Sequence, residues 1–463
     1  MAAYSPREFK ALSFHDASPH FAEGADTPRA YLERCLEAIA AREPVVRAWA
    51  ALNEAGAREA ADASATRWRS GRPLSPIDGL PIGVKDLLET RDMPTEMGCE
   101  AYRGNFPKRD NAAVWALRQA GAVVLGKTVT AELGGTQPGP TTNPFDPSRT
   151  PGGSSSGSAA AVAARMVPAA IGTQVGGSIV RPASYCGNVA LKPTQGAINR
   201  GERQATSMST HGVHAGCVED MWQVAIEIVR RAGGDPGRLG LFGPPAPPPA
   251  QRPLALAVME TEGWAALDSE SRAAFEEVVE QLRAQGVAVL RRGDHPFLDA
   301  FEHAIEGAQA MANAITAWEN HWGIRNLVAQ HPDGVSARTK AVLAAAERMT
   351  PEDYRALLMR REEARRRHEA LAPLADALIA PASPGPAPVW TGETPGQPPA
   401  ARPTGDSVFN TPSSALGAPV VTAPLAGVRG LPMGVQVLGQ PHADARVTAI
   451  ARWMLETLEP VEA

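Results

Sequence analysis

The sequence predicts an α/β fold in which helices are layered against a sheet. Short apolar runs typical of buried strands alternate along the 463-residue chain with longer segments whose apolar residues follow a helical period. Hydrophobic residues make up 44% of the chain and charged residues 21%, as is usual for globular proteins. Glycine (43 residues) and proline (42 residues) are both frequent, so we expect many specified turns between the elements.

The first expected elements are two helices. Thr27 and Pro28 are typical of an N-cap followed by the first helical position. Four apolar residues between positions 32 and 39 then recur at helical spacing, which indicates one buried face. Residues 53–70, rich in alanine and arginine, predict the second helix.

The next segments predict strands separated by a helix. The apolar run 80–84 predicts a short strand that ends in Lys85-Asp86. Residues 111–120 predict a helix, and residues 122–125 a second buried strand.

A polar, turn-rich stretch follows from 134 to 158. It leads into six small apolar residues, 159–164, which predict a closely packed helix. Residues 167–171 predict a strand, and another glycine-rich turn is expected to begin at Gly172.

The second half of the chain begins with a proline-rich connector at 244–253. Thr350-Pro351-Glu352-Asp353 is typical of a helix start, and the mixed-sign run after it predicts a solvated helix face. The segment 381–406 predicts either a pocket loop or a surface loop. The other expected elements are strands at 254–258, 287–290, 418–423 and 434–438, and helices at 268–285, over most of 298–372, and at 442–458.

Composition and chain ends exclude several classes of protein. The formal net charge of −5 argues against nucleic acid as a partner. No signal peptide is visible and no run of 18 apolar residues occurs, so we expect a cytoplasmic chain that does not bind membranes. Metal chemistry is not expected, because no ligand motif is present. The four cysteines are scattered and are expected to be reduced structural thiols: Cys35, Cys99, Cys186 and Cys217.

Three glycine-rich motifs could carry chemistry. The first, from Gly121 to Thr128, matches the nucleotide-binding pattern GxxxxGK[ST]. Its variable positions are Ala-Val-Val-Leu, which predict a buried strand, and a helix rather than a strand comes before it. A buried strand cannot wrap a phosphate, so we favour a structural role over nucleotide binding.

The second motif, Gly153 to Gly157, matches the GxSxG elbow, which would make Ser155 a nucleophile. The segment before it is broken by prolines and cannot be the central strand that an elbow needs. The third motif is Gly176-Gly177-Ser178-Ile179, where two glycines could direct successive amides into one oxyanion hole. Alone it is a weak signal.

Taken together, the lysine segment and the two serine segments resemble those of the amidase signature family. Gly83-Val84-Lys85-Asp86 resembles its lysine segment, 151–160 its Gly/Ser-rich core, and 172–179 its nucleophile segment. The 24-residue separation of Ser154 and Ser178 is the family spacing. The resemblance covers roughly 25–458, more weakly over 240–375. It implies an α/β/α sandwich with a central mixed sheet covered by helices.

The nucleophile segment departs from the family pattern Asp-Thr-Gly-Gly-Ser-Ile-Arg. This chain has Gln174 in place of the aspartate and Val180 in place of the arginine, with Arg181 one position later. Ser156 also stands where glycine is usual. No catalytic group is lost, so these departures bear on substrate identity.

The resemblance implies a Ser–cis-Ser–Lys triad that needs no cofactor. Ser178 would attack the carbonyl, and Ser154, at a cis peptide bond, would relay its proton to Lys85. Burial after the apolar 80–84 run would keep Lys85 neutral. Ser155 would support Lys85 by a hydrogen bond. The oxyanion hole would be formed by the amides of Ser178 and of three further residues, Val175, Gly176 and Gly177.

The resemblance also implies where substrate would bind. Gly134 and Gly135 would line the pocket, with 298–325 and 385–412 as walls. Trp318, Trp322 and Trp390 either bound the substrate or, more in keeping with helical tryptophans, pack in the core. His211 and His214 are expected near the site or on the surface. The expected organisation is one large domain: an N-terminal helical region at 1–75, the signature core at 76–240, a variable helical segment at 241–380 and the C-terminal part of the core at 381–463.

The expected reaction is cleavage of the C–N bond of a small linear amide through an acyl-enzyme. Carbamate or ester cleavage by the same triad stays open. A glutamine-hydrolysing amidotransferase subunit is a further alternative, although the segment 196–204 does not resemble that subfamily. A nucleotide-binding protein built on 121–128 is the alternative from another class. Homodimers are common in such families, and the sequence leaves the oligomeric state open.

Overall fold

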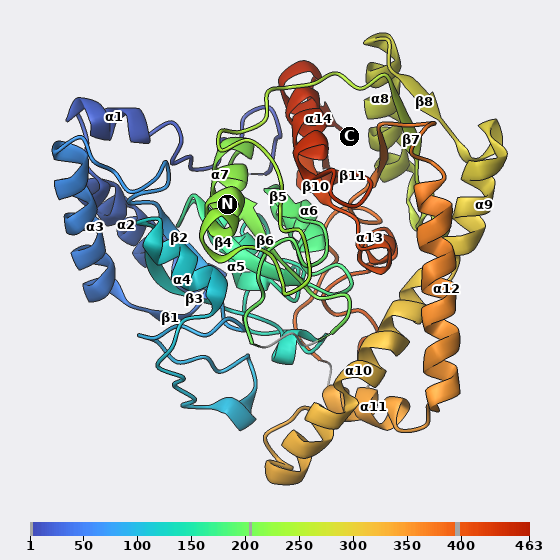
Figure 1. Cartoon of the computed structure of the whole chain (residues 1–463), viewed down its shortest axis with the longest axis horizontal. Coiled ribbons are helices and arrows are strands. Elements are labelled where there is room, and N and C mark those ends of the chain that lie inside the picture. The colour runs from blue at the N-terminus through green and yellow to red at the C-terminus, as the bar shows by residue number, and fades with distance from the viewer. Residues whose placement is uncertain (1–2, 203–205, 394–398) are drawn as a thin grey trace.

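A single mixed sheet runs through the molecule, as the computed structural model shows (Figure 1). The structure describes residues 3–202, 206–393 and 399–463; the end of the 196–204 segment and part of the 381–406 segment lie outside these ranges. The twelve strands of the sheet follow the order β1-β3-β2-β4-β6-β5-β10-β11-β9-β7-β8, with β12 paired to β10. Helices cover both faces of this sheet, which confirms the α/β class with a central mixed sheet.

The strands are β1 (Trp49–Leu52), β2 (Pro81–Lys85), β3 (Val123–Thr128), β4 (Ala169–Gln174), β5 (Val189–Lys192), β6 (Thr210–Ala215), β7 (Ala255–Val258), β8 (Ala288–Leu290), β9 (Ala377–Pro381), β10 (Val420–Val428), β11 (Leu431–Leu438) and β12 (Val461–Glu462).

The α-helices are α1 (Ser18–Glu23), α2 (Pro28–Val46), α3 (Glu54–Arg69), α4 (Ala112–Gln119), α5 (Ser156–Ala163), α6 (Val180–Cys186), α7 (Val218–Ala232), α8 (Ser269–Ala284), α9 (Pro296–Ile305), α10 (Ala308–Gln330), α11 (Ala337–Ala346), α12 (Pro351–Glu369), α13 (Thr411–Leu416) and α14 (Asp444–Thr457). Short 3-10 turns at Glu100–Tyr102, Glu132–Gly134, Glu262–Ala266 and Arg292–Asp294 complete the described elements.

The two halves of the chain join in the middle of the sheet. Strand β5 pairs antiparallel with β10, so that Leu191 lies opposite Val421. On the N-terminal side β2 lies between β3 and β4, parallel to both. The carboxyl ends of these parallel strands meet at one edge, where Lys85 ends β2.

Apolar side chains fill both faces of the sheet. One large cluster joins helices α4, α7, α8 and α14 to one face, with Trp222 fully buried in it. On the other face, α2, α3 and α5 pack around β3, while α9, α10, α12 and α13 pack in a further cluster beside the C-terminal strands. Helix α5 consists of small residues, all buried, which lets it lie close to the sheet.

The expected turn at Gly172 is wrong, because β4 continues through this residue to Gln174. Gly172 pairs with Gly212 in the neighbouring strand. A Cβ atom at Gly172 would lie 2.9 Å from Ser155 Oγ and 3.0 Å from His214 Nε2. The glycine therefore permits close packing inside a strand and does not turn the chain.

Helices α10, α11 and α12 project from the sheet at one side of the molecule (Figure 1, yellow to orange). Only four of the 23 residues of α10 are buried. Trp322 is 63% exposed and Trp318 stacks against Tyr354 with ring centroids 5.8 Å apart. The expectation that these tryptophans pack in the core is wrong for Trp322, since α10 has solvent on much of its surface.

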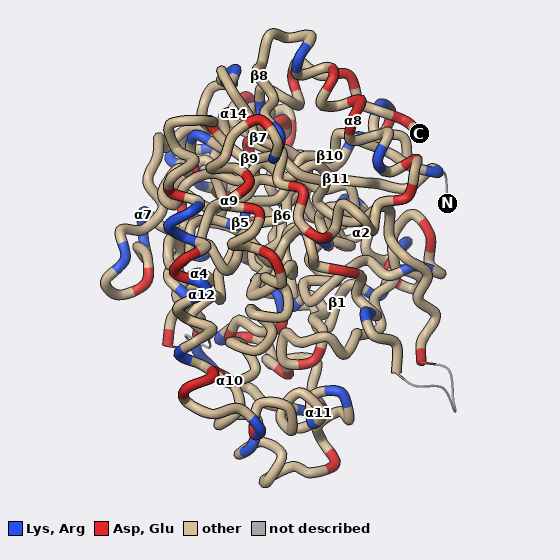
Figure 2. Tube along the Cα trace, turned by 90° about the vertical axis from the view of Figure 1, so that its right-hand side faces the viewer, with Lys and Arg blue, Asp and Glu red and all other residues tan. Residues whose placement is uncertain are grey.

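Basic and acidic residues are interspersed along the chain (Figure 2). On α12, Arg366 pairs with Glu363 and Arg365 with Glu362, in both cases one helical turn apart. Arg366 is 66% exposed, which confirms the solvated face expected for this run. The Thr350 capping box that begins α12 is also present.

Candidate active site

Lys85 lies at the centre of a buried polar cluster at the end of β2. Its side chain is fully buried. Its Nζ lies 2.8 Å from Ser154 Oγ, 2.8 Å from Thr173 Oγ1 and 3.0 Å from Ser155 Oγ. The structure therefore brings together three of the expected residues, Lys85, Ser154 and Ser155, and adds Thr173 from β4.

Burial lowers the pKa of Lys85 well below its ordinary value, because the charged form loses its hydration. The hydroxyl of Ser155 donates to the carbonyl oxygen of Thr173 at 3.1 Å, so its oxygen can accept from Lys85. A neutral amine has two N–H groups and one lone pair. Donation to Ser155 and Thr173 would leave the lone pair for the hydroxyl proton of Ser154.

Ser154 follows a cis peptide bond, Gly153–Ser154, in the part of the chain where the family resemblance implies one. The guanidinium of Arg181 donates to the carbonyl oxygen of Gly153 at 2.6 Å. The same guanidinium packs against the next loop, since a Cβ atom at Gly177 would lie 2.7 Å from its Nη1. Arg181 thus joins the cis-peptide segment to the loop that carries Ser178.

The loop that carries Ser178 leaves successive amides available. Ser178 is half-buried in the turn between β4 and α6. Among the described residues we find no acceptor for the amides of Gly176, Gly177 and Ser178. The next two amides, of Ile179 and Val180, donate to Gln174 Oε1 at 2.8 and 3.0 Å.

The side chain of Gln174 therefore holds the backbone of this loop from its buried side. It is fully buried, and its Nε2 donates to Ser414 Oγ at 3.1 Å. Ser414 in turn donates to the carbonyl oxygen of Gly176 at 3.2 Å. A neutral amide here can both accept two backbone protons and donate to a hydroxyl, which the aspartate of the family pattern could not do.

The expected pocket residues lie on two sides of this cluster. A Cβ atom at Gly134 would lie 3.8 Å from Ser154 Oγ, whereas Gly135 is exposed. From the 385–412 wall, Ser407 lies against Gly177. From the 298–325 wall, Gln309 donates to Ser407 Oγ at 2.9 Å. Trp390 is joined by its amide to Ser148, a contact outside this cluster.

His211 and His214 are buried rather than exposed, and burial lowers the pKa of each to about 3. His211 pairs with Thr173 across β4 and β6. Both rings are therefore neutral near pH 7, and neither ring nitrogen of His214 has a described partner.

Two alternatives drawn from motifs are wrong. Residues 123–128 of the nucleotide-binding pattern form strand β3, and Lys127 is buried with its Nζ 2.8 Å from Asp86 Oδ1. Ser155, the nucleophile of the elbow alternative, is fully buried and its hydroxyl is engaged with Thr173. With Lys192, which is also fully buried, the chain holds three lysines in its interior.

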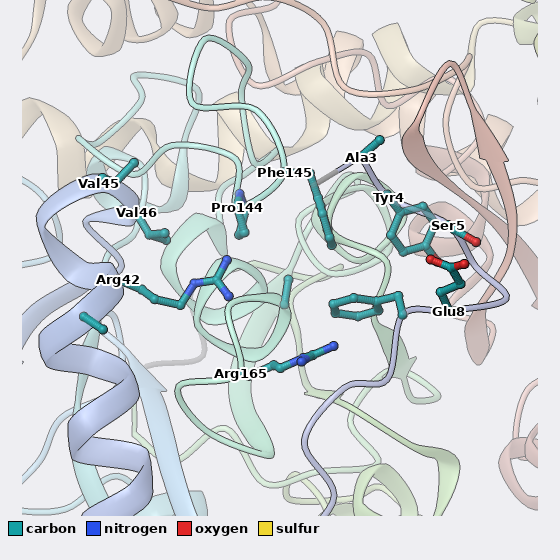
Figure 3. A pocket seen from close by; sticks show the side chains of 13 residues that line it. Ala3, Tyr4, Ser5, Glu8, Arg42, Val45, Val46, Pro144, Phe145 and Arg165 are labelled. Carbon is teal, nitrogen blue, oxygen red and sulfur yellow. The ribbon is translucent and has the colours of Figure 1, made fainter. Parts of the chain in front are cut away.

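A cavity of about 610 Å³ lies beside the cluster. Leu87 and His211 line its wall. Leu87 also lies next to Gly134, since a Cβ atom at Gly134 would be 2.9 Å from its Cδ1. A second cavity, of about 560 Å³, lies between the N-terminal segment, α2 and the end of α5 (Figure 3). Its labelled side chains include Arg42, Arg165 and Phe145, and the described residues that line it do not include the lysine or serines of the cluster.

Several residues of the cluster were missed from the sequence. Thr173 lies within the 172–179 segment but was given no role there. Thr404, which carries no motif, joins the site because Arg181 donates to its carbonyl oxygen at 2.7 Å and to its hydroxyl at 3.1 Å. The signal for Arg181 was its position after Ser178, one residue later than the family arginine.

Within the described residues, no helix is long and apolar enough to cross a membrane, and no three His, Cys, Asp or Glu side chains are grouped to hold a metal ion.

Known sequences and structures resemble this chain along most of its length. The family model Amidase matches residues 30–448. The A subunit of a glutamyl-tRNA(Gln) amidotransferase from Myxococcus xanthus is 31% identical over 93% of both chains. The corresponding protein from Chloroflexus aggregans is 43% identical, over 42% of this chain and 41% of that protein. The match therefore spans less than half the length of the Chloroflexus relative.

Solved structures share the whole fold. A crystal structure of an amidase covers 96% of this chain and 100% of its own, with a TM-score of 0.83 and 31% identity. A peptide amidase from Stenotrophomonas maltophilia covers 97% and 98%, with a TM-score of 0.76 and 26% identity. Because the family model spans residues 30–448, the chain belongs to the amidase family.

Proposed function

We propose that this chain is a serine hydrolase that cleaves the C–N bond of a small linear amide through an acyl-enzyme. The observation that carries the proposal is the fully buried Lys85 amine, 2.8 Å from Ser154 Oγ. A buried amine with a lowered pKa can act as a general base near neutral pH, which an ordinary lysine cannot do.

In the proposed reaction, Ser178 Oγ forms a bond to the substrate carbonyl carbon as its proton passes to Ser154 Oγ. The proton of Ser154 passes at the same time to Lys85 Nζ. The amides of Val175, Gly176, Gly177 and Ser178 stabilise the oxyanion.

The C–N bond then breaks. Lys85 returns its proton through Ser154 to the departing amine, which leaves as a neutral molecule. Water then attacks the acyl carbon and gives up a proton through Ser154 to Lys85. As the bond from the acyl carbon to Ser178 Oγ breaks, Lys85 returns this proton through Ser154 to Ser178 Oγ, and the acid leaves.

The test is a turnover screen of the purified chain with matched substrates: aryl amides, aliphatic amides, a C-terminally amidated peptide, carbamates and esters. Ser178→Ala should lower turnover at least about 10³-fold with the thermal melting curve unchanged. If Ser178→Ala kept more than about a tenth of the activity, the assignment of the nucleophile would be wrong. Preference for carbamates or esters would keep the triad and change the substrate class.

A second candidate is a glutamine-hydrolysing amidotransferase component, because relatives of that name align with up to 93% of the chain. It predicts glutamine hydrolysis that depends on a second, co-purifying protein. Turnover of aryl amides by the chain alone, without activity on glutamine, would favour the stand-alone amidase.

A further inference from the structure

Glu132 is a buried carboxylate whose partners come from the start of a distant helix. Its side chain is 5% exposed. Ser336, the N-cap residue of α11, donates to it from its backbone amide at 2.9 Å and from its hydroxyl. Thr339, in the first turn of α11, donates from its hydroxyl at 2.5 Å. Such charge-assisted bonds at a helix N-terminus are among the stronger hydrogen bonds in proteins.

The backbone of Glu132 belongs to the segment that lies against Ser154. The amide of Ala131 donates to the carbonyl oxygen of Ser154 at 3.0 Å, and the amide of Gly135 donates to that of Glu132 at 2.7 Å. Leu133 (φ 52°) and Gly134 (φ 75°) are both left-handed. The turn is therefore tight, and Gly134 is held where a Cβ atom would be 3.8 Å from Ser154 Oγ.

The other side of this contact is the helical projection α10–α12. The residues before α11 dock on the same region, since the amide of Ala101 donates to the carbonyl oxygen of Gly334 at 2.9 Å. Val335 is buried there. Because much of α10 is exposed, this docking joins the free end of the projection to the body of the protein.

We propose that Glu132 is a positioning residue: it ties the start of α11 to the turn at Gly134 and so fixes the wall against which substrate is held beside Ser154. The proposal rests on the proposed function of this site. The carboxylate does not contact the lysine or serines of the cluster, so its effect reaches substrate only through the backbone of Leu133 and Gly134.

The kinetic test uses Glu132→Ala, with Glu132→Gln as the conservative variant and Glu100→Ala as the matched control. Glu100 is exposed, pairs only with Arg103 in the described structure, and lies in the same region. Glu132→Ala should raise KM at least about tenfold and change kcat less than about threefold. Glu132→Gln, which keeps the shape and one acceptor oxygen, should recover most of this loss, and the control should match wild type.

Variants on the other side of the contact separate positioning from simple destabilisation. Ser336→Ala combined with Thr339→Val removes two of the three donors and should raise KM in the same direction. Added to Glu132→Ala, it should change KM by less than about twofold further, because both act on one contact. An unchanged KM in folded Glu132→Ala, or effects that multiply, would overturn the proposal.

Hydrogen exchange tests the docking without turnover. Glu132→Ala should speed amide exchange in 131–137 and 333–341 while leaving 351–369 unchanged. If Ser178→Ala proved fully active, the proposed function would fail, yet this exchange pattern would still report on the contact. Uniform exchange changes, or none, would refute the coupling itself. If Glu132→Ala does not fold, Ser336→Ala combined with Thr339→Val provides the same measurement from the other side of the contact.

Discussion

Replacing Gln174 tests whether the buried hydrogen bonds of its side chain hold the loop that carries Ser178 in its conformation. Gln174→Leu keeps the approximate size of the side chain and removes the acceptor of two buried amides, those of Ile179 and Val180. A buried donor without a partner costs about 1–3 kcal/mol, so the two together cost about 2–6 kcal/mol if the loop stays in place. Moving the loop costs less free energy than unfolding the whole protein. We therefore expect the loop to shift in this variant, which would displace the amides proposed to form the oxyanion hole.

The expected result for Gln174→Leu is a fall in kcat of about 10²–10³-fold, comparable to the loss of one oxyanion-hole donor. The assay measures kcat and KM on the best substrate of the screen, together with urea unfolding. Gln174→Glu is the control, because a carboxylate can accept the same two amides. A kcat within about threefold of wild type for Gln174→Leu, or equal losses in both variants, would refute the reasoning.

Three further predictions concern the same region and the fold. Gly134→Ala should lower kcat/KM at least about tenfold, because the new Cβ atom would lie 2.9 Å from Leu87 and close to Ser154. Gly24→Ala is the control, since Gly24 has the same φ of 75° but no atom within 4 Å of the new Cβ. It should lower stability by only about 1 kcal/mol and leave activity unchanged. Activity should rise with pH as Lys85 loses its proton, with a midpoint well below the ordinary lysine pKa of about 10.4. Because the pKa of Lys85 is lower in the folded protein, the unfolded chain binds more protons at pH values between the folded and unfolded pKa. The free energy of unfolding therefore rises with pH over this range, and Lys85→Met should make the rise less steep. An unchanged pH dependence of the unfolding free energy, measured by urea titration, would contradict the burial argument. Asp78→Asn breaks the ion pair between Arg67 and the fully buried carboxylate of Asp78, and should cost about 3 kcal/mol of unfolding free energy. Asp62→Asn, at an exposed pair, should cost less than about 1 kcal/mol.

The strands and helices nearest the site were predictable because their sequence patterns are local. The run that ends at Lys85 and the small-residue helix after Ser155 both formed within a few residues of the expected positions. Strands β5 and β6 and helix α7 were not predicted, although all three are buried around the sheet. Their burial depends on neighbours far along the chain, which no local pattern reports.

The same distinction applies to the site. Lys85, Ser154 and Ser178 stand in motifs, whereas Glu132 and Gln174 matter through contacts with residues about 200 or more positions away. Long-range contacts of this kind are set by the sheet order, which joins the two halves through β5 and β10. The prediction that Trp322 packs in the core was wrong for the same reason. The exposure of α10 depends on long-range contacts between helices α10–α12 and the rest of the protein.

The burial of Lys85, Lys127 and Lys192 has a practical consequence for chemical labelling. The chain contains only six lysines, so half of them are in the interior and the surface cations are almost all arginines. Amine-directed reagents should therefore modify the lysines of the folded protein mainly at the other three positions, leaving Lys85 unmodified. Immobilisation through amines would use few attachment points, and delayed labelling of Lys85 would report on opening of the core.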